Sequence, residues 1–363
     1  MAKRARLTAT PPAMMEDEAP QFPLFRLPQK EILRTIRLMR IDFILIFSLI
    51  SKRCKNLAAS IKWKGLTVHA TICEIVKIHL VIKREIFRLE YRTVDWNVPK
   101  SINERKLTAP FEMTTCFKTK WDWNNNFEMK DWVQHFLTVF SRKNVDELHL
   151  TEESTQFNLE HLKEIFGRPT ELSVEKTPNH EYNQLMLQTF LPVDRLEIYI
   201  QIFENSKIPP EILNRNFSNL SIVSLEYGLN LNLDVLLMAK AKSLHFRGFY
   251  FAELDFNKFI KRWMRHGANP ELEYLCLTNP QFENKNDLTI MRRIWHEQVP
   301  LTETRRFKTV GYDNPLEVRG GNDIWRREDR MKATIVVEDV GIYHYWQMFV
   351  WKEHCVVEDA HLD

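Results

Sequence analysis

The middle of the chain repeats a short pattern in which two apolar residues flank one other residue. Six such pairs occur, and their first members lie 24, 24, 27, 21 and 31 residues apart. A period of two is typical of a β-strand, and the residues between successive pairs recur with the period of a helix. We therefore predict strand–helix units over residues 145–280. The pairs are Leu148 and Leu150, Leu172 and Val174, Leu196 and Ile198, Val223 and Leu225, Leu244 and Phe246, and Leu275 and Leu277.

A strand and a helix repeated about every 25 residues are typical of a leucine-rich-repeat-like β/α solenoid. The irregular spacing and the missing repeat Asn make this a degenerate example. The clearest helical segment, Phe256 to Met264, is expected to end at Gly267, with Pro270 following. We expect the strands to form a parallel sheet with helices on its other face. The repeated apolar positions then form the core, and the sheet edge and loops remain for binding.

Three short helices are predicted between residues 22 and 62. Pro28 fixes the backbone where the first helix begins, Asp42 is a candidate N-cap for the second, and Ser51 for the third. Three short helices in about 40 residues cannot bury a core alone. Their remaining apolar face is either a docking surface or packs on the rest of the chain, and the pattern does not decide between these alternatives.

Strands are predicted on both sides of the repeats. β-Branched and aromatic residues indicate strands at 66–70, 75–82 and 86–91, before a helix at 129–140. Near the C-terminus, residues 323–327 and 331–337 indicate a hairpin around 328–330, and 349–351 another strand. The expected organisation is a flexible tail (1–21), a helical domain (22–62), a connecting region (63–144), the repeats (145–280) and a β-rich C-terminal part (281–363).

Composition argues against nucleotide-dependent and hydrolytic enzymes. The chain has 363 residues, of which 44% are hydrophobic and only nine are Gly. Phosphate-binding loops need Gly so that the backbone can approach the ligand, and the sequence has no G-x-G-x-x-G, Walker or G-x-S-x-G motif. The formal charge of +3 does not point to nucleic acid or a membrane.

The cysteine pattern and the apolar runs suggest an intracellular protein, cytoplasmic or nuclear. Five widely spaced cysteines never form C-x-x-C, so neither a disulfide framework nor a zinc site is expected. The longest apolar run, 43–50, is far shorter than the ~20 residues that cross a bilayer. No apolar segment follows the basic residues at the N-terminus, which argues against a secretory signal.

The candidate reactive groups have more probable structural roles. The His and Cys residues near the C-terminus lack a standard zinc spacing. No residue close in sequence to Cys54 could act as a base that activates its thiol. Basic residues beside aromatics would serve a nucleic-acid hypothesis, but they are more often helix surfaces. We therefore expect no enzyme activity, no metal and no cofactor. The residues considered are His344, His354, Cys355 and His361 for a metal, and Arg292, Arg293, Arg305, Arg306, Lys308, Trp295 and Phe307 for nucleic acid.

The first predicted helices resemble an F-box. The matching features are the Leu-Pro opening at Leu27 and Pro28, the paired aliphatics Ile32 and Leu33, the apolar second helix, and Ser51-Lys52-Arg53-Cys54 at the start of the third. Short helical hairpins imitate each of these features separately, and their combination with the rest of the chain is more specific.

The stretch from Glu253 to Leu275 resembles the type 2 F-box-associated domain, which is typical of a large nematode family of F-box proteins. The C-terminal residues from Gly320 to Trp351 are also similar to that family. One departure concerns the last hairpin, where the family commonly has Asp-Gly and this chain has Asp329-Arg330. Without Gly, a turn that needs a positive φ is more strained.

The resemblance implies an adaptor without bond chemistry. Its F-box would bind the Skp-type subunit of an SCF (Skp–cullin–F-box) ubiquitin ligase, and its C-terminal domain would hold a protein substrate of unknown identity. The alternative is a stand-alone leucine-rich-repeat-like binding module. If these helices dock the Skp-type subunit, we expect the faces of Ile32, Leu33, Ile36 and Ile44 to be unburied in the isolated chain. The residues expected to bind the Skp-type subunit are Leu24, Leu27, Pro28, Ile32, Leu33, Ile36, Ile44, Leu45, Leu49 and Cys54.

Overall fold

The chain divides into two compact units, Met1–Lys62 and Trp63–Asp363, called here the helical unit and the sheet unit. The expected tail at 1–21, Cys116, Gly267 and His361 lie outside the described residues. The computed structural model describes residues 24–82, 85–92, 102–108, 112–115, 120–121, 127–177, 179–226, 229–266, 268–280, 287–312 and 314–357.

The helical unit contains the three predicted helices. Pro28 immediately precedes the first, and the Oγ of Ser51 accepts a hydrogen bond from the Cys54 N–H at 3.2 Å, as expected of an N-cap. The prediction that Asp42 is an N-cap is wrong, because Arg40 occupies the N-cap position of the second helix. Asp42 instead accepts a hydrogen bond from the Nε of Arg40 at 3.1 Å. The elements are η1 (Leu24–Arg26), α1 (Gln29–Leu38), α2 (Ile41–Ile50) and α3 (Lys52–Ala59).

The sheet unit contains, within its described residues, one mixed sheet of 15 strands. Seven neighbouring strands at its centre are parallel, and they include all six that the sequence predicts. The parallel arrangement predicted for 145–280 is therefore confirmed. In spatial order these strands are β1 (Leu66–Ile72), β6 (Glu147–Leu150), β7 (Glu171–Val174), β8 (Arg195–Tyr199), β9 (Asn219–Val223), β11 (Ser243–Arg247) and β13 (Tyr274–Pro280).

The repeat is more regular than the sequence suggested. In β9 the buried residues are Leu220 and Ile222, while Val223 is half-buried and Leu225 is 59% exposed. The predicted pair Val223 and Leu225 is therefore wrong, because it takes the run of alternating residues three positions too late. With Leu220 in its place, four successive intervals are 24 residues long, and Leu196, Leu220 and Leu244 are direct partners in adjacent strands.

Antiparallel strands extend the sheet beyond both ends of the parallel strands. The three strands predicted at 66–91 are confirmed, and so is the hairpin near the C-terminus. Arg330, in the turn of this hairpin, has a φ of 60°, in the left-handed region that favours Gly. The added strands are β2 (Val76–Ile82), β3 (Glu85–Arg92), β4 (Glu112–Thr115) and β5 (Lys120–Trp121) at one end, and β19 (Tyr343–Val350), β18 (Lys332–Val340), β17 (Asn322–Trp325) and β14 (Glu297–Gln298) at the other.

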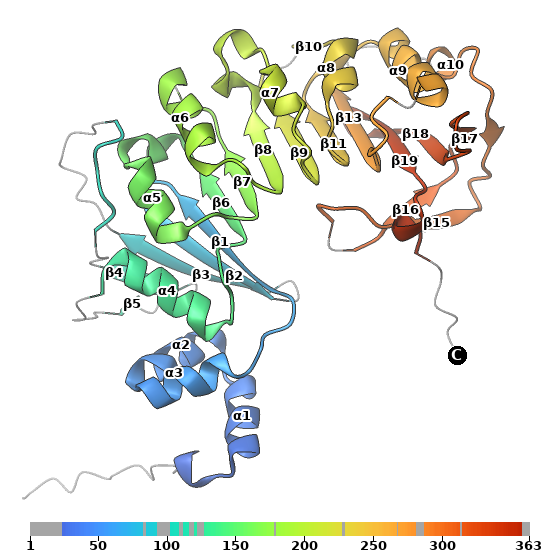
Figure 1. Cartoon of the computed structure of the whole chain (residues 1–363). Helices are drawn as coiled ribbons and strands as arrows, with labels where there is room; N and C mark the ends of the chain where they lie inside the picture. Colours follow the sequence, from blue (N-terminus) through green and yellow to red (C-terminus); the bar gives the residue numbers. More distant parts are fainter. Residues whose placement is uncertain are drawn as a thin grey trace, which may run out of the picture. The chain divides into compact units, whose positions relative to one another are not determined.

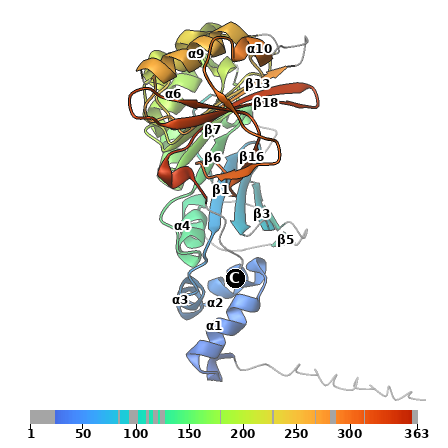
Figure 2. The ribbon, with the colours of Figure 1, turned by 90° about the vertical axis from the view of Figure 1, so that its right-hand side faces the viewer.

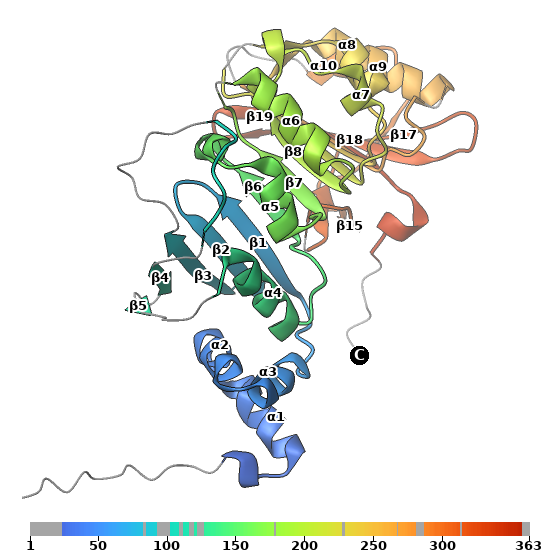
Figure 3. The same cartoon turned by 60° about the vertical axis from the view of Figure 1, so that its left-hand side comes forward.

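Helices cover one face of the sheet. Figure 1 shows α5 to α9 following one another along this face, and Figure 3 shows α4 and α5 over the strands at the other end. Trp132 and Phe136 of α4 pack on Tyr91 of β3, and Phe256 of α9 stacks on Trp346 of β19 at 5.5 Å between ring centroids. The helices are α4 (Met129–Val139), α5 (Leu159–Phe166), α6 (His180–Phe190), α7 (Pro210–Leu213), α8 (Leu233–Met238), α9 (Glu253–His266) and α10 (Asp287–Ile290).

A hairpin that the sequence did not predict covers part of the opposite face. It consists of β15 (Thr304–Phe307) and β16 (Leu316–Arg319). Figure 2 shows β16 on the side of β13 and β18 away from α9 and α10. The remaining short elements are η2 (Glu152–Gln156), η3 (Ile200–Ile202), η4 (Glu204–Ser206), η5 (Glu353–Cys355), and the paired β10 (Asn230–Leu231) and β12 (Tyr250–Phe251).

Candidate functional site

Half of the residues expected to bind the Skp-type subunit are buried in the chain. Ile32 is 3% exposed, and Ile36 and Ile44 are fully buried, as are Leu45 and Cys54 to within 1%. The expectation that the faces of Ile32, Ile36 and Ile44 are unburied is therefore wrong. These side chains form apolar core, because three short helices bury the residues that recur at helical spacing. Of the others, Pro28 is exposed and four are half-buried: Leu24, Leu27, Leu33 and Leu49.

Other apolar side chains of the helical unit are exposed. They are Phe25 (43%), Leu38 (82%), Phe43 (53%) and Ile50 (69%), called here the exposed apolar set. Phe25 stacks on Phe47, with ring centroids 6.3 Å apart. The sequence contained this signal, since α2 is apolar at almost every position and one helix cannot bury its whole circumference in so small a unit.

The exposed apolar set lies in a strongly basic segment. Residues 24–62 contain nine Lys and Arg against two Asp and Glu, a formal charge of +7. Arg53 lies over the Phe25 ring at 4.6 Å, and Arg40 over the Phe43 ring at 5.2 Å. Such stacking holds a cation beside an apolar surface. The combination suits a partner that presents apolar residues with acidic residues around them.

The second candidate surface is the face of the parallel strands opposite the helices. Along each strand the polar residues alternate with the buried Leu positions, so they share this face. We call it the open polar face. The sequence analysis missed it, although the same alternation that located the core also marks it. Its residues in register are Glu147, Glu171, Arg195 and Asn219 in one row, and His149, Ser173, Glu197 and Ser221 in the next.

Charged groups on the open polar face are paired with one another. The Nδ1 of His69 lies 2.7 Å from Glu147, and Arg195 lies 3.0 Å from Glu171. Two further pairs join His149 to Glu175 at 2.9 Å and Arg247 to Glu197 at 2.5 Å. The hydrogen bond from His69 lowers the pKa of Glu147, whereas burial raises the pKa of Glu171. Acids and bases are paired here, so the face is suited to polar recognition of a macromolecule.

The β15–β16 hairpin covers the end of this face. Phe307 and Val318 of the hairpin form a core with Tyr274, Cys276 and three other buried residues, Val336, Phe349 and Cys355. The loop between the two strands continues this cover, because the Tyr312 ring lies against those of Tyr274 and His245, at 6.0 and 5.9 Å. The open polar face therefore runs from β1 to β9, where Asn219 and Ser221 are already buried, and it ends at this loop.

The residues considered for metal binding fall into two places. His344 pairs with Asp339 on the β18–β19 hairpin. The Nε2 of His354 lies 3.0 Å from Glu273, and the ligand atoms of Glu273, His354 and Cys355 lie within 4.8 Å of one another. Burial and the neighbouring Glu273 raise the pKa of the Cys355 thiol to about 12, so the sulfur stays protonated.

The side chain of Lys242 already places a positive charge beside this cluster. Lys242 lies 3.9 Å from the Glu273 carboxylate, and a second cation bound to the same carboxylate would meet its positive charge. Glu273 is therefore a buried carboxylate with Lys242 and His354 as local partners.

Three of the other residues considered as reactive or nucleic-acid-binding have identifiable surroundings. Cys54 accepts a hydrogen bond from the Ser51 hydroxyl, with the oxygen and sulfur 3.1 Å apart. Phe307 is fully buried, so it does not offer a stacking surface to a base. Trp295 is exposed, and its ring packs on Trp325 at 5.2 Å.

Within the described part of the chain, every helix is too short or too polar to span a bilayer.

Comparison with known proteins gives two findings. A family described as F-box associated matches residues 208–277, a range that contains α7 to α9 and most of β13 and includes the stretch Glu253–Leu275 noted in the sequence. The chain is also similar to the F-box associated domain-containing protein sdz-33 of Caenorhabditis elegans, with 21% identity over 291 residues that cover 80% of this chain and 85% of the relative. No solved structure matches the chain significantly.

Proposed function

We propose that this chain, which matches an F-box-associated family over residues 208–277 and is similar to a nematode F-box associated domain-containing protein, is the substrate-recognition adaptor of an SCF-type cullin–RING ubiquitin ligase. The helical unit is the F-box and binds the Skp-type subunit. The parallel strands and their helices form a leucine-rich-repeat-like domain that holds a protein substrate. The protein acts inside the cell, in the cytoplasm or nucleus, and performs no bond chemistry itself.

The observation that carries the proposal is the order of the two parts. A separate unit of three helices, with exposed apolar side chains at 82% for Leu38 and 69% for Ile50, precedes the F-box-associated match. Isolated exposed apolar residues are ordinary, but four in one unit of about 40 residues suit a protein interface. The charge of this segment supports a partner with an acidic surface.

The open polar face is the proposed substrate-binding surface. Its charged residues are half-buried on a hydrogen-bonded sheet, so a partner meets them in fixed positions. Their existing pairs, such as Arg195 with Glu171, set the pattern of charge that a substrate must match. An adaptor of this kind accelerates ubiquitin transfer by raising the effective concentration of substrate lysines beside the charged enzyme.

Binding to a purified Skp-type subunit tests the proposal. We expect the full chain to bind it, and Leu38→Asp to weaken binding at least tenfold, because an unpaired carboxylate loses its water in an apolar contact. Leu301→Asp is the matched control, since Leu301 is equally exposed at 80% but belongs to the sheet unit. Calorimetric titration of the three proteins measures the two affinities relative to wild type.

The alternative is a stand-alone binding module outside a ligase. The burial of Ile32, Ile36 and Ile44 favours it, because those aliphatic side chains are occupied within the chain. Absence of heat with the wild-type chain at tens of micromolar Skp-type subunit would establish this alternative. Equal weakening by Leu38→Asp and Leu301→Asp would place the interface elsewhere.

A further inference from the structure

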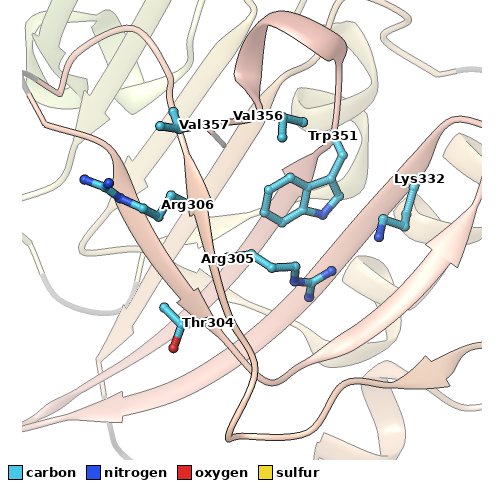
Figure 4. A pocket seen from close by; sticks show the side chains of 7 residues that line it. All are labelled: Thr304, Arg305, Arg306, Lys332, Trp351, Val356 and Val357. Carbon is cyan, nitrogen blue, oxygen red and sulfur yellow. The ribbon is translucent and has the colours of Figure 1, made fainter. Parts of the chain in front are cut away.

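A small cavity with basic walls lies beside the β15–β16 hairpin in the sheet unit. Its volume is about 280 Å³, enough for the end of a side chain, and Figure 4 shows the Trp351 ring at its centre with Arg305 beside it. The walls come from β15, the start of β18, and the segment after β19. The residues that line the cavity are Thr304, Arg305, Arg306, Lys332, Trp351, Val356 and Val357.

The lining residues include three cations and no carboxylate. Two carboxylates lie next to them. Asp323 accepts from the Nη1 of Arg305 at 3.0 and 3.1 Å and lies 3.4 Å from Lys332, and Glu303, half exposed, lies 3.5 Å from the Nε of Arg305. Both carboxylates contact Arg305, whereas the lining of the cavity itself is cationic, and a cationic wall favours an anion.

Arg305 has hydrogen-bonding capacity that is not used. Its side chain is only 14% exposed, and neither Nε nor Nη2 has a hydrogen-bond partner among the described residues. Buried donors on a charged group are normally satisfied, because leaving them unpaired is unfavourable. An acceptor that enters from the cavity would supply the missing hydrogen bonds, and the planar guanidinium is well matched to the oxygens of carboxylate or phosphate.

The surrounding residues hold this arrangement in place. The guanidinium of Arg305 lies over the Trp351 ring at 4.9 Å, and the indole N–H of Trp351 donates to Thr334 at 2.7 Å. The hydroxyl of Thr334 in turn donates to Asp323 at 2.6 Å, which completes a chain of contacts back to Arg305. A site fixed in this way loses little conformational entropy when it binds a ligand.

We propose that this cavity binds an anionic group, carboxylate or phosphate, carried on a side chain of a partner protein. Arg305, Lys332 and Arg306 supply the positive charge, and Trp351 with Val356 and Val357 provides the apolar wall for the stem of that side chain. The proposal goes beyond the ligase adaptor function and does not depend on it, since the cavity lies wholly within the sheet unit.

Titration of the full chain with N-acetyl-phosphoserine amide and N-acetyl-glutamate amide at constant ionic strength tests the proposal. The readout is the NMR signal of the Trp351 indole N–H, assigned by its loss in Trp351→Phe. We expect a saturable shift, and binding at least about fivefold weaker in Lys332→Gln and Arg306→Gln. The matched control is Arg319→Gln, since Arg319 is an exposed cation of the same hairpin that does not line the cavity.

The two ligands distinguish the sources of the anion. Binding of the phosphoserine compound alone assigns a phosphorylated partner, and binding of both assigns acidic side chains as well. A shift without saturation, or equal weakening in Arg319→Gln and Lys332→Gln, would overturn the proposal, because either result indicates diffuse attraction.

The chain itself offers a competing anion. The acidic residues Glu358 and Asp359 directly follow Val357 in sequence. If the double variant Glu358→Gln, Asp359→Asn binds the compounds and the wild-type chain does not, the occupant is this chain's own acidic segment, and the proposed external ligand is wrong.

Discussion

His245 illustrates how one polar residue on a covered part of the sheet affects stability. It lies between the rings of Tyr274 and Tyr312, and its Nε2 is 3.0 Å from the Ser243 hydroxyl. Burial, with a smaller contribution from Arg247, lowers the pKa of His245 to about 4 from an ordinary value of 6.5. The folded protein therefore keeps this imidazole neutral where the unfolded chain would take up a proton.

This lowered pKa predicts a loss of stability in mild acid. The contribution of His245 is complete above pH 6.5, where both states are neutral, and is lost as the pH falls from about 6.5 to about 4. At about 1.4 kcal/mol per pKa unit, the loss reaches up to about 3 kcal/mol. Urea unfolding at several pH values should show a shallower decline in His245→Gln than in wild type. Parallel curves for the two proteins would contradict the assignment.

Gly248 is required by a close approach of two backbone segments. Its φ is 81°, and a Cβ at this position would lie 2.3 Å from the Ser224 carbonyl oxygen. Gly341 also has a positive φ, 63°, but a Cβ there would have no atom within 4 Å. The two positions separate the effect of backbone conformation from that of crowding.

We expect Gly248→Ala to lower the free energy of unfolding by about 3 kcal/mol or more, because strain of about 1–2 kcal/mol adds to an overpacking cost of similar size. Gly341→Ala should lower it by about 1 kcal/mol, from strain alone. Chemical denaturation measures both differences. Equal effects would mean that the approach to Ser224 relaxes without cost.

Among the secondary-structure elements, the sequence predicted the strands in which apolar and polar residues alternate over a long stretch or in a repeated pattern. The apolar alternation located five of the six parallel strands in register and placed β9 three residues late. The β-branched runs located β1, β2 and β3, since a half-buried strand needs a period of two. The same alternation also marks the open polar face. The sequence analysis missed this face because it treated the polar residues only as spacers between apolar positions.

The failures have particular physical causes. Leu220 in β9 and Leu225 just after it belong to one alternating apolar stretch, and only pairing with β8 and β11 selects the register. The β15–β16 hairpin is short, and its Phe307 is buried against strands distant in sequence. In the helical unit the pattern identified the apolar residues, but tertiary packing decides which of them are buried and which are exposed.

The register of β9 can be tested directly. Leu220→Ala should destabilise the protein by about 2–5 kcal/mol, because Leu220 is fully buried in the sheet and its removal leaves a cavity. Leu225→Ala should change stability by less than about 0.5 kcal/mol, since the Leu225 side chain is 59% exposed. Thermal unfolding of the two variants distinguishes them. A larger loss of stability in Leu225→Ala would instead support Val223 and Leu225 as the buried pair, as the sequence alone predicted.

At the scale of the whole molecule, the proposal assigns binding of the Skp-type subunit to the helical unit and binding of the substrate to the sheet unit. The helical unit is small, basic and apolar at its surface, whereas the sheet unit has its own extensive core and a charged face. Domains with separate cores commonly fold and bind separately. A partner of the helical unit should therefore leave the hydrogen-bonded strands of the sheet unit unchanged.

Hydrogen–deuterium exchange of the full chain, with and without a saturating Skp-type subunit, tests this division most directly. Amide exchange reports local opening, and a bound partner slows it where the contact stabilises the backbone. We predict slower exchange in peptides from α1, α2 and α3, and no change in peptides from β6 to β13. Protection confined to the sheet unit, or none anywhere under saturating conditions, would contradict the assignment of the helical unit as the ligase-docking part of the protein.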